Sequence, residues 1–497
     1  MTRPHRCIAF SRALVGIEAR KVTIETHLQS GTPGFVLVGL PESALREART
    51  RVHSAIQNSG FEYPSQRIVV NLAPADLAKE GTRYDLAIAM TVLAAVGVIP
   101  PAALARYEFL GELGLFGEIR SARGALCAAL AASGSERLLI VPDSNLDECR
   151  ALPDSAIGAT SLSDVVRLVR DDIRPTRASK ARPTTANKPT NAIIGQESAK
   201  RAMLVAAAGG HHALLIGPPG AGKSMLAEQL IDLLPMLPRE QAMEVAAIYS
   251  AAGFECPPQQ RPPLRAPHHS ASAVALIGGG PQGLPGEITL SHCGVLFLDE
   301  LPHFKPSVLD HLREPLQARR VHIARARYRL DYPAGFQLIA AMNPCPAGRS
   351  CDAQSCRCTP NQRDRYQARL SGPLLDRIDL HVRVPALPPH RLIEAPRDDL
   401  EERAQAAKVA REVQLERQGA LNAAVPFSDL LRGLHASARD LLDQALERGQ
   451  LTARSTHKML RVARTTADLE RSADIQRQHM AEALSYRALD WESGVRA

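Results

Sequence analysis

Ala213-Leu214-Leu215-Ile216, followed directly by Gly217-Pro218-Pro219-Gly220-Ala221-Gly222-Lys223-Ser224, is the stretch that decides the fold of this chain. The apolar run predicts a buried strand, the turn fits the phosphate-loop spacing G-x-x-x-x-G-K-S, and the amphipathic residues 225–234 predict a helix. Glycines allow backbone N–H groups to close on a triphosphate, and a helix N-terminus adds a partial positive charge. We expect Lys223 to reach the β- and γ-phosphates and the Ser224 hydroxyl to ligate Mg²⁺. The alternative is a glycine-rich turn before an ordinary helix.

Two carboxylates follow a second apolar run. Residues 295–298 precede Asp299 and Glu300, about 75 residues beyond Lys223. Such a run is typical of a buried parallel strand, whose carboxyl end points into the site of an α/β fold. Asp299 is expected to hold Mg²⁺, directly or through water, and Glu300 to polarise the attacking water as general base. With the phosphate loop, this pair predicts nucleotide hydrolysis.

A third apolar run, over residues 336–342, ends at Asn343. In a parallel sheet this amide lies beside the ends of the other two predicted strands, where it could orient water against the γ-phosphate. The alternative role for Asn343 is turn formation before Pro344.

Two arginines belong to the predicted site. Arg377 stands among apolar residues in a short predicted helix. In ring-forming NTPases an arginine at this place reaches the γ-phosphate of the neighbouring subunit and stabilises transition-state charge. A local salt bridge with Asp376 or Asp379 is the alternative. Arg454 opens a later predicted helix, where we expect it to reach back over the nucleotide.

Length and composition indicate several domains and no membrane or export segment. With 497 residues the chain exceeds one typical core, and 45% hydrophobic and 23% charged residues are typical of a globular protein. The uncharged stretch 86–105 is interrupted by Pro100-Pro101, so we expect a core helix there and not a membrane span. The first residues lack the apolar segment of an export signal, which favours a cytoplasmic protein whose cysteines are thiols or metal ligands. The net charge of +8 permits an acidic partner such as nucleic acid, but only weakly indicates one.

The predicted organisation has four parts. Three prolines, five basic residues and few large apolar side chains make the segment around residues 173–190 a linker. The fold class is α/β, with the following boundaries: an N-terminal domain over 1–172, the linker over 173–190, a nucleotide-binding core with a parallel sheet over 191–396, and a helical lid over 397–497.

The N-terminal unit resembles the Lon-protease-like domain, of the ribosomal S5 domain 2 superfamily, around residues 71–76 and 79–86. In the proteolytic members of that group a serine nucleophile follows a Lys-Asp-Gly-Pro run, and here Arg83 stands at its position. Without a nucleophile in reach of a base, acyl transfer has no starting point. We therefore predict a scaffold or binding platform and not a protease.

The chain as a whole resembles the AAA+ ATPases of the magnesium-chelatase-like group, and within it the ComM/YifB family of bacterial competence proteins. The resemblance extends over nearly the whole length. Besides the motifs above, it is carried by residues 194–197, 265–270, 343–346, 374–379, 453–454 and 461–464.

This resemblance implies roles for individual residues. They are the Walker A residues Lys223 and Ser224, the Walker B residues Asp299 and Glu300, sensor 1 at Asn343, the arginine finger at Arg377 and sensor 2 at Arg454. Residues 217–225, which end at Met225, and Gln196 form the implied ATP-binding set, with Mg²⁺ as the metal.

The resemblance also implies a cellular activity. It is a homo-hexameric DNA helicase that acts on single-stranded and branched DNA, with a recombinase as a further partner. Branch migration by such a motor promotes integration of incoming single strands in natural transformation and homologous recombination. The alternative is a protein-remodelling or metal-insertion ATPase, as in the chelatase and MoxR relatives that share the core.

A cysteine-rich loop follows the third predicted strand. Its four thiols could hold a structural Zn²⁺, and a reduced loop without metal is the alternative. The family's usual Asn-Pro-Cys-Pro-Cys-Gly run has Ala347 at the second cysteine here. The candidate ligands are Cys345, Cys351, Cys356 and Cys358.

Apolar and basic residues alternate over residues 319–330, which predicts a strand or hairpin with one basic face. In ring helicases a hairpin just before sensor 1 grips the phosphate backbone, and basic side chains there would bind DNA in a salt-sensitive way. An edge hairpin with solvated charges is the alternative. For His268 and His269, a pore insert and a core position remain open.

Overall fold

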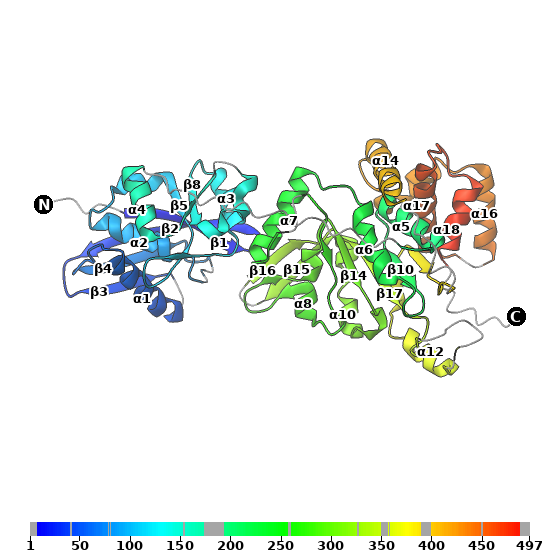
Figure 1. Ribbon diagram of the computed structural model, residues 1–497, viewed down its shortest axis with the longest axis horizontal. Helices are drawn as coiled ribbons and strands as arrows, with labels where there is room; N and C mark the ends of the chain where they lie inside the picture. The colour runs from blue at the N-terminus through cyan, green and yellow to red at the C-terminus, as the bar shows by residue number, and fades with distance from the viewer. Residues whose placement is uncertain are drawn as a thin grey trace.

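The computed structural model describes residues 7–39, 42–77, 79, 81–152, 155–172, 193–256, 260–325, 328–348, 356, 358–388, 399–448 and 451–487. The predicted linker and Cys351 lie outside these described residues. Figure 1 shows an elongated arrangement in which the N-terminal domain, the nucleotide-binding core and the C-terminal helices follow one another along the long axis. None of the described helices is both long and apolar enough to cross a membrane.

The N-terminal domain is built on a seven-stranded mixed sheet in the order β3-β4-β2-β1-β5-β8-β9. The two pairings β1–β2 and β2–β4 are antiparallel and the others parallel. The strands are β1 (Cys7–Val15), β2 (Glu18–Gln29), β3 (Gly34–Val38), β4 (Arg67–Ala73), β5 (Tyr107–Phe109), β8 (Leu138–Pro142) and β9 (Ala156–Ala159), with a small ribbon of β6 (Glu112–Leu113) and β7 (Ile119–Arg120) beside them.

Four helices pack with this sheet: α1 (Glu42–Asn58), α2 (Asp85–Ala95), α3 (Ala125–Ser133) and α4 (Leu162–Asp171). Every residue of α2 from Asp85 to Ala94 is buried, and all of them except Asp85 and Thr91 are apolar, as expected for a helix that faces protein on all sides. The expectation of a core helix in the uncharged stretch is thereby confirmed.

The nucleotide-binding core contains a five-stranded parallel sheet in the order β11-β14-β17-β10-β18, which confirms the predicted parallel α/β architecture. Its strands are β10 (Ala213–Ile216), β11 (Leu264–Arg265), β14 (Val295–Leu298), β17 (Gln337–Met342) and β18 (Leu380–Arg383). The larger helices of this part are α5 (Glu197–Gly209), α6 (Lys223–Leu233) and α7 (Arg239–Ala252). Shorter helices are α8 (Ala273–Ile277), α9 (Glu287–Leu290), α10 (Pro306–Asp310), α11 (Pro315–Ala318), α12 (Pro360–Gln367) and α13 (Gly372–Leu375).

Two antiparallel ribbons lie beside the parallel sheet of the core. The short one pairs β12 (Gly278–Gly279) with β13 (Leu284–Pro285), and the long hairpin pairs β15 (Arg320–Arg325) with β16 (Tyr328–Pro333). The Tyr332 hydroxyl donates a hydrogen bond of 2.5 Å to the Gly283 carbonyl, and the Tyr328 hydroxyl donates to that of Gly280. The two ribbons therefore form one unit.

The C-terminal helices are α14 (Leu400–Gln418), α15 (Phe427–Leu431), α16 (Ala436–Glu447), α17 (Ala453–Leu469) and α18 (Arg477–Ser485). α14 packs on α5 and α6, and α17 packs on α5 (Figure 1). Ala407, Met459 and Leu460 share one apolar core with Leu215 of β10 and Leu230 of α6. Lid and nucleotide-binding core are thus one packed body.

The N-terminal domain contacts the core through α3 and α7. The backbone N–H of Gly124 donates to the Ser250 carbonyl at 2.8 Å, and that of Leu126 donates to the Ser250 hydroxyl at 3.2 Å. Ala247 and Ala251 of α7 are buried in the same cluster as α3. Buried apolar side chains and hydrogen-bonded backbone groups thus together form the contact between the two domains.

Candidate ATP-hydrolysing site

The phosphate loop lies at the carboxyl edge of the sheet, between β10 and α6. Gly220 and Gly222 have φ of 76° and 89°, a left-handed conformation that disfavours residues with a Cβ. A Cβ at Gly217 would lie 2.1 Å from the Val384 carbonyl oxygen. The three glycines are thus required by backbone conformation and close packing.

Lys223 is buried at the start of α6. Its Nζ donates to the carbonyls of Gly217 at 2.8 Å and Pro218 at 2.9 Å, and to Asn343 Oδ1 at 3.1 Å. Burial lowers the lysine pKa, while the charges of Asp299 and Glu300 act in the opposite direction. The structure therefore brings together the predicted Walker A lysine and sensor 1.

Ser224 and Asp299 meet at the same edge. The Ser224 hydroxyl donates to Asp299 Oδ2 at 2.9 Å, and the backbone N–H of Glu300 donates to Asp299 Oδ1 at 2.8 Å. A hydroxyl and a carboxylate oxygen in contact are the hard oxygen donors that Mg²⁺ prefers. These two residues fit the metal that the sequence predicts.

Glu300 follows β14 with φ of 50°, and its side chain is 51% exposed. His269 Nδ1 lies 3.4 Å from its carboxylate, and the ring of His268 lies 4.0 Å from that of His269. His269 is thus neither in a core position nor far from the chemistry. The pairing that explains this position is structural: residues after β11 reach the edge where β14 ends, because Arg265 pairs with Leu296 in parallel register.

Gln196 and Met225 flank the phosphate loop. Gln196 Nε2 donates to the carbonyls of Ala221 at 3.1 Å and Pro385 at 2.7 Å, and so ties the loop to the end of β18. Met225 is partly exposed at the start of α6. Gln196 thus acts on the backbone of the loop.

Arg377 lies at the opposite edge of the sheet. Because β18 runs parallel to β10, with Ala213 paired to Leu380, the segment before β18 lies at the start of β10. The phosphate loop follows its other end. Arg377 Nη1 donates to the Pro373 carbonyl at 2.7 Å, and Nη2 donates to Gln317 Oε1 at 3.2 Å.

The surroundings of Arg377 are cationic. Burial lowers its pKa most, and the charges of Arg454 and Arg313 lower it further. Within the described part of the chain it forms no ion pair with Asp376 or Asp379, so the alternative of a local salt bridge is not realised there.

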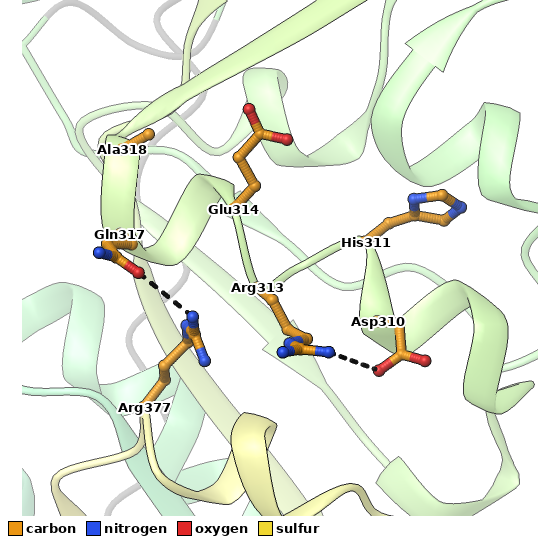
Figure 2. A pocket seen from close by; sticks show the side chains of 7 residues that line it. All are labelled: Asp310, His311, Arg313, Glu314, Gln317, Ala318 and Arg377. Carbon is orange, nitrogen blue, oxygen red and sulfur yellow. Dashed lines mark hydrogen bonds and ion pairs between the residues drawn. The ribbon is translucent and has the colours of Figure 1, made fainter.

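A cavity of about 660 Å³ opens beside Arg377. In Figure 2 Arg377 turns toward Gln317, and Arg313 turns toward Asp310, with which it forms a 3.9 Å ion pair. The lining residues are Asp310, His311, Arg313, Glu314, Gln317, Ala318 and Arg377.

Arg454 lies near Arg377. Its Nη1 lies 3.9 Å from Asp376 Oδ2, at the same edge of the sheet as Arg377, so within one chain it does not lie over the phosphate loop. The reason is the packing of α17, whose Lys458 donates to the Ile378 carbonyl at 3.0 Å. Arg454 precedes Lys458 by one helical turn on the same face. It therefore joins Arg377 and not Lys223.

In the N-terminal domain, Arg83 is the residue that the sequence predicts at the position of the protease nucleophile. Its Nη2 donates to the Arg123 carbonyl at 2.8 Å. Lys79 donates to the Leu77 carbonyl at 3.2 Å and to the Pro74 carbonyl. These contacts are to backbone carbonyls and form no hydrolytic pair.

Two clusters of metal-ligand type occur among the described residues. The sulfur atoms of Cys345, Cys356 and Cys358 lie within 4.8 Å of one another. Cys345 is in a disulfide, so a zinc site requires that bond to be reduced.

The second cluster is Glu244, His292 and Cys293. His292 Nδ1 accepts from the Gly335 N–H at 2.9 Å, so Nε2 carries the proton and points to Glu244 at 3.1 Å. Burial raises the pKa of the Cys293 thiol to about 12. A protonated nitrogen and a thiol are poor metal ligands, so these contacts do not indicate a metal site.

The hairpin β15–β16 has the predicted two faces. Val321, Ile323, Leu330 and Tyr332 are buried. The exposed face carries an ion-pair cluster at its base, where Asp331 contacts Arg320 Nε at 2.8 Å and His322 Nδ1 at 3.2 Å. Toward the tip, Arg325 and Arg329 are exposed and form no ion pair with another described residue. Residues 326 and 327 lie outside the description.

Comparisons with known proteins agree with this architecture. Residues 190–392 match the family described as magnesium chelatase, subunit ChlI; residues 24–145 and 399–487 match a further ChlI segment and its C-terminal part. The chain is 44% identical to the protein YifB of Escherichia coli K12 over 492 residues, and 44% identical to the competence protein ComM of Haemophilus influenzae over 497 residues. Each alignment covers 97% of both chains. A 178-residue segment is 27% identical to Lon protease 2 of Bacillus subtilis, over 31% of this chain and 32% of that protein.

Proposed function

The chain belongs to the ComM/YifB family of magnesium-chelatase-like AAA+ ATPases, and on this premise we propose that it is an ATP-driven DNA motor that works as a hexameric ring. ATP and Mg²⁺ are the cofactors of this family. The motor would move single-stranded or branched DNA and drive branch migration. The name of the Haemophilus relative, a competence protein, suggests the setting: integration of incoming single strands in natural transformation and homologous recombination.

The proposal of a ring rests on one observation: the site residues are divided between two opposite edges of the sheet. Lys223, Asn343 and Glu300 lie at one edge, where a triphosphate binds, and Arg377 and Arg454 lie at the other. A cation that stabilises developing phosphate charge must touch that phosphate. The two arginines can therefore contact a phosphate only if the edge that carries them in one copy faces the phosphate loop of the next copy.

In such an interface the residues divide the chemistry. Lys223 binds the β- and γ-phosphates, and the Asn343 amide orients the water that Glu300 activates as general base. Mg²⁺, held by Ser224 and Asp299, would supply charge neutralisation at the phosphates. The neighbouring Arg377 contacts the γ-phosphate, and its effect is on turnover because that charge grows in the transition state.

Support for DNA comes from the hairpin. Toward its tip Arg329, on the exposed face, and Arg325, at the end of β15, are exposed without an acidic partner among the described residues, whereas the charges at the base of the exposed face are already paired. Such guanidinium groups bind phosphates without reading sequence. A motor that moves along any DNA requires this kind of contact.

The test is ATPase activity with and without DNA, followed by strand displacement on a three-way or four-way junction. We expect single-stranded or branched DNA to stimulate hydrolysis strongly. Glu300→Gln should bind ATP but hydrolyse it slowly and displace no strand. Indifference to DNA, combined with stimulation by a protein partner, would instead favour a remodelling or metal-insertion ATPase of the chelatase or MoxR kind.

A further inference from the structure

The segment that carries Arg377 is fixed at both ends by neighbouring elements. On one side Ile378 is buried in the core, and the backbone N–H groups of Asp379 and Leu380 both donate to the His212 carbonyl, at 3.1 and 3.0 Å. The Asp379 carboxylate in turn accepts from the His212 N–H at 3.3 Å. These contacts fix the segment after Arg377 to the start of β10.

The lid helix α17 fixes the same segment from the other side. Lys458 Nζ donates to the Ile378 carbonyl at 3.0 Å, and Arg454 Nη1 lies 3.9 Å from the Asp376 carboxylate. Asp376 and Ile378 are the two chain neighbours of Arg377. One face of one helix thus contacts the residue before and the residue after the finger.

Lys458 is placed for this contact at some cost. It is half-buried, and burial lowers its pKa to about 8 although Asp379 and Asp376 act to raise it. An ammonium group in such surroundings persists when its hydrogen bonds and nearby carboxylates compensate for lost hydration. Here the bond to the Ile378 carbonyl and the charges of Asp379 and Asp376 provide that compensation.

We propose that Lys458 is a positioning residue for the arginine finger: its bond to the Ile378 carbonyl holds Arg377 in the orientation that serves the neighbouring subunit. Lys458 touches no substrate itself and acts through the backbone beside Arg377. This inference rests on the proposed function, because it requires that Arg377 works in trans. It also makes lid helix and finger one unit, so that a shift of α17 moves Arg377 and Arg454 together.

The first measurement is the effect of Lys458→Met on steady-state hydrolysis. Methionine keeps the apolar stem and removes the donor, so we expect kcat to fall roughly tenfold to a hundredfold, the range that a misplaced catalytic group causes, with KM unchanged. Lys458→Arg, which retains a charged donor, should recover much of kcat. Lys408→Met, at an exposed lysine on α14, is the matched control and should behave as wild type. Wild-type kcat in Lys458→Met would overturn the proposal.

The second measurement separates a finger role from a role in the subunit's own site. Lys458→Met subunits are mixed with Glu300→Gln subunits before nucleotide is added. A Lys458→Met subunit keeps an intact phosphate loop and Glu300, and a Glu300→Gln subunit keeps an intact finger. Where the phosphate loop of the first faces the finger of the second, the interface is complete. After random mixing in equal amounts, this is the case at about a quarter of the interfaces. ATPase activity of the mixture should therefore exceed the sum of the separate variants.

A parallel mixture of Arg377→Ala subunits with Glu300→Gln subunits distinguishes failure of this inference from failure of the proposed function. If that mixture recovers activity and the Lys458→Met mixture does not, Lys458 serves its own subunit and the inference is wrong. If neither recovers, the trans finger of the proposed function is wrong. Should Lys458→Met not fold, Lys458→Gln, which is neutral and shorter, takes its place in the same mixture.

Discussion

Within the described part of the hairpin β15–β16, one arginine is unpaired and another is paired with an aspartate. We therefore predict opposite effects on DNA binding for substitutions at Arg329 and at Asp331. Arg329 is exposed and has no ion-pair partner among the described residues, whereas Asp331 neutralises Arg320 and contacts His322. Arg329→Ala removes a cation that is available to DNA. Asp331→Asn releases Arg320, which then becomes available. Both side chains point to solvent, so neither change should alter folding by more than about 0.5 kcal/mol.

The magnitude follows from counterion release. Each phosphate of a single strand that a protein cation neutralises contributes about 0.7 to the slope of log affinity against log salt. Arg329→Ala should reduce that slope by about 0.7 for every subunit whose hairpin contacts the strand. Over a fourfold change in salt, each lost contact changes the affinity ratio by a factor of roughly 2.6. Asp331→Asn should raise the slope by a similar amount and tighten binding at low salt.

The assay is fluorescence anisotropy of a labelled oligonucleotide over a salt series. Both substitutions are made in the Glu300→Gln background with ATP present, so that hydrolysis does not disturb the equilibrium. Thermal unfolding of each variant confirms that the fold is retained. The pair is informative because the two expected slope changes have opposite signs, which a general loss of structure cannot produce.

Equal slopes in the two variants and the parent would refute the reasoning, provided that the parent binds DNA. The hairpin would then be an edge hairpin whose charges serve solubility, and the DNA contact would lie elsewhere. A weaker and flatter response from Asp331→Asn would contradict it as well, since that carboxylate would then be supporting the bound state.

Two further predictions concern pH and metal. Burial lowers the pKa of His212 and of His381 to about 4. The unfolded chain takes up these protons near pH 6.5, so stability is complete above that pH and falls as the pH drops toward 4, by roughly 3 kcal/mol per histidine; His381→Gln should flatten this dependence in urea unfolding measured at several pH values. For the sulfur cluster of Cys345, Cys356 and Cys358, elemental analysis of protein purified with reductant should find close to one zinc per chain. Zinc-free protein with full ATPase activity would exclude a structural zinc.

Much of the nucleotide edge could be predicted because its determinants are local. Each of three features follows an apolar strand: the phosphate loop, the acidic pair and the sensor. Parallel strands bring their carboxyl ends to one edge of the sheet. The sequence therefore predicted that Lys223, Asp299 and Asn343 belong together. His269 was missed as a neighbour of Glu300, although the parallel pairing of β11 with β14 places it there.

Arg454 could not be placed in the same way. A helix start shows where a side chain leaves the backbone, but not against which surface the helix packs. α17 packs on α5 and reaches the segment before β18 through Lys458, and this packing depends on residues more than 200 positions away in the sequence. Local periodicity carries no information about that choice, so the sequence alone did not place Arg454 beside Asp376.

The two edges of the site are also linked by two short strands, β10 and β18. β10 has four residues, Ala213–Ile216; His212 at one end accepts the bonds that fix the finger segment, and Gly217 at the other begins the phosphate loop. Beside it Gln196 joins the loop to Pro385, just after β18. Strands β10 and β18 thus carry both half-sites at their opposite ends. In a ring, a change in the phosphate loop of one subunit and a change in the finger that it offers to the next would have to pass through the same two strands, which is a physical basis for neighbouring sites to work in sequence.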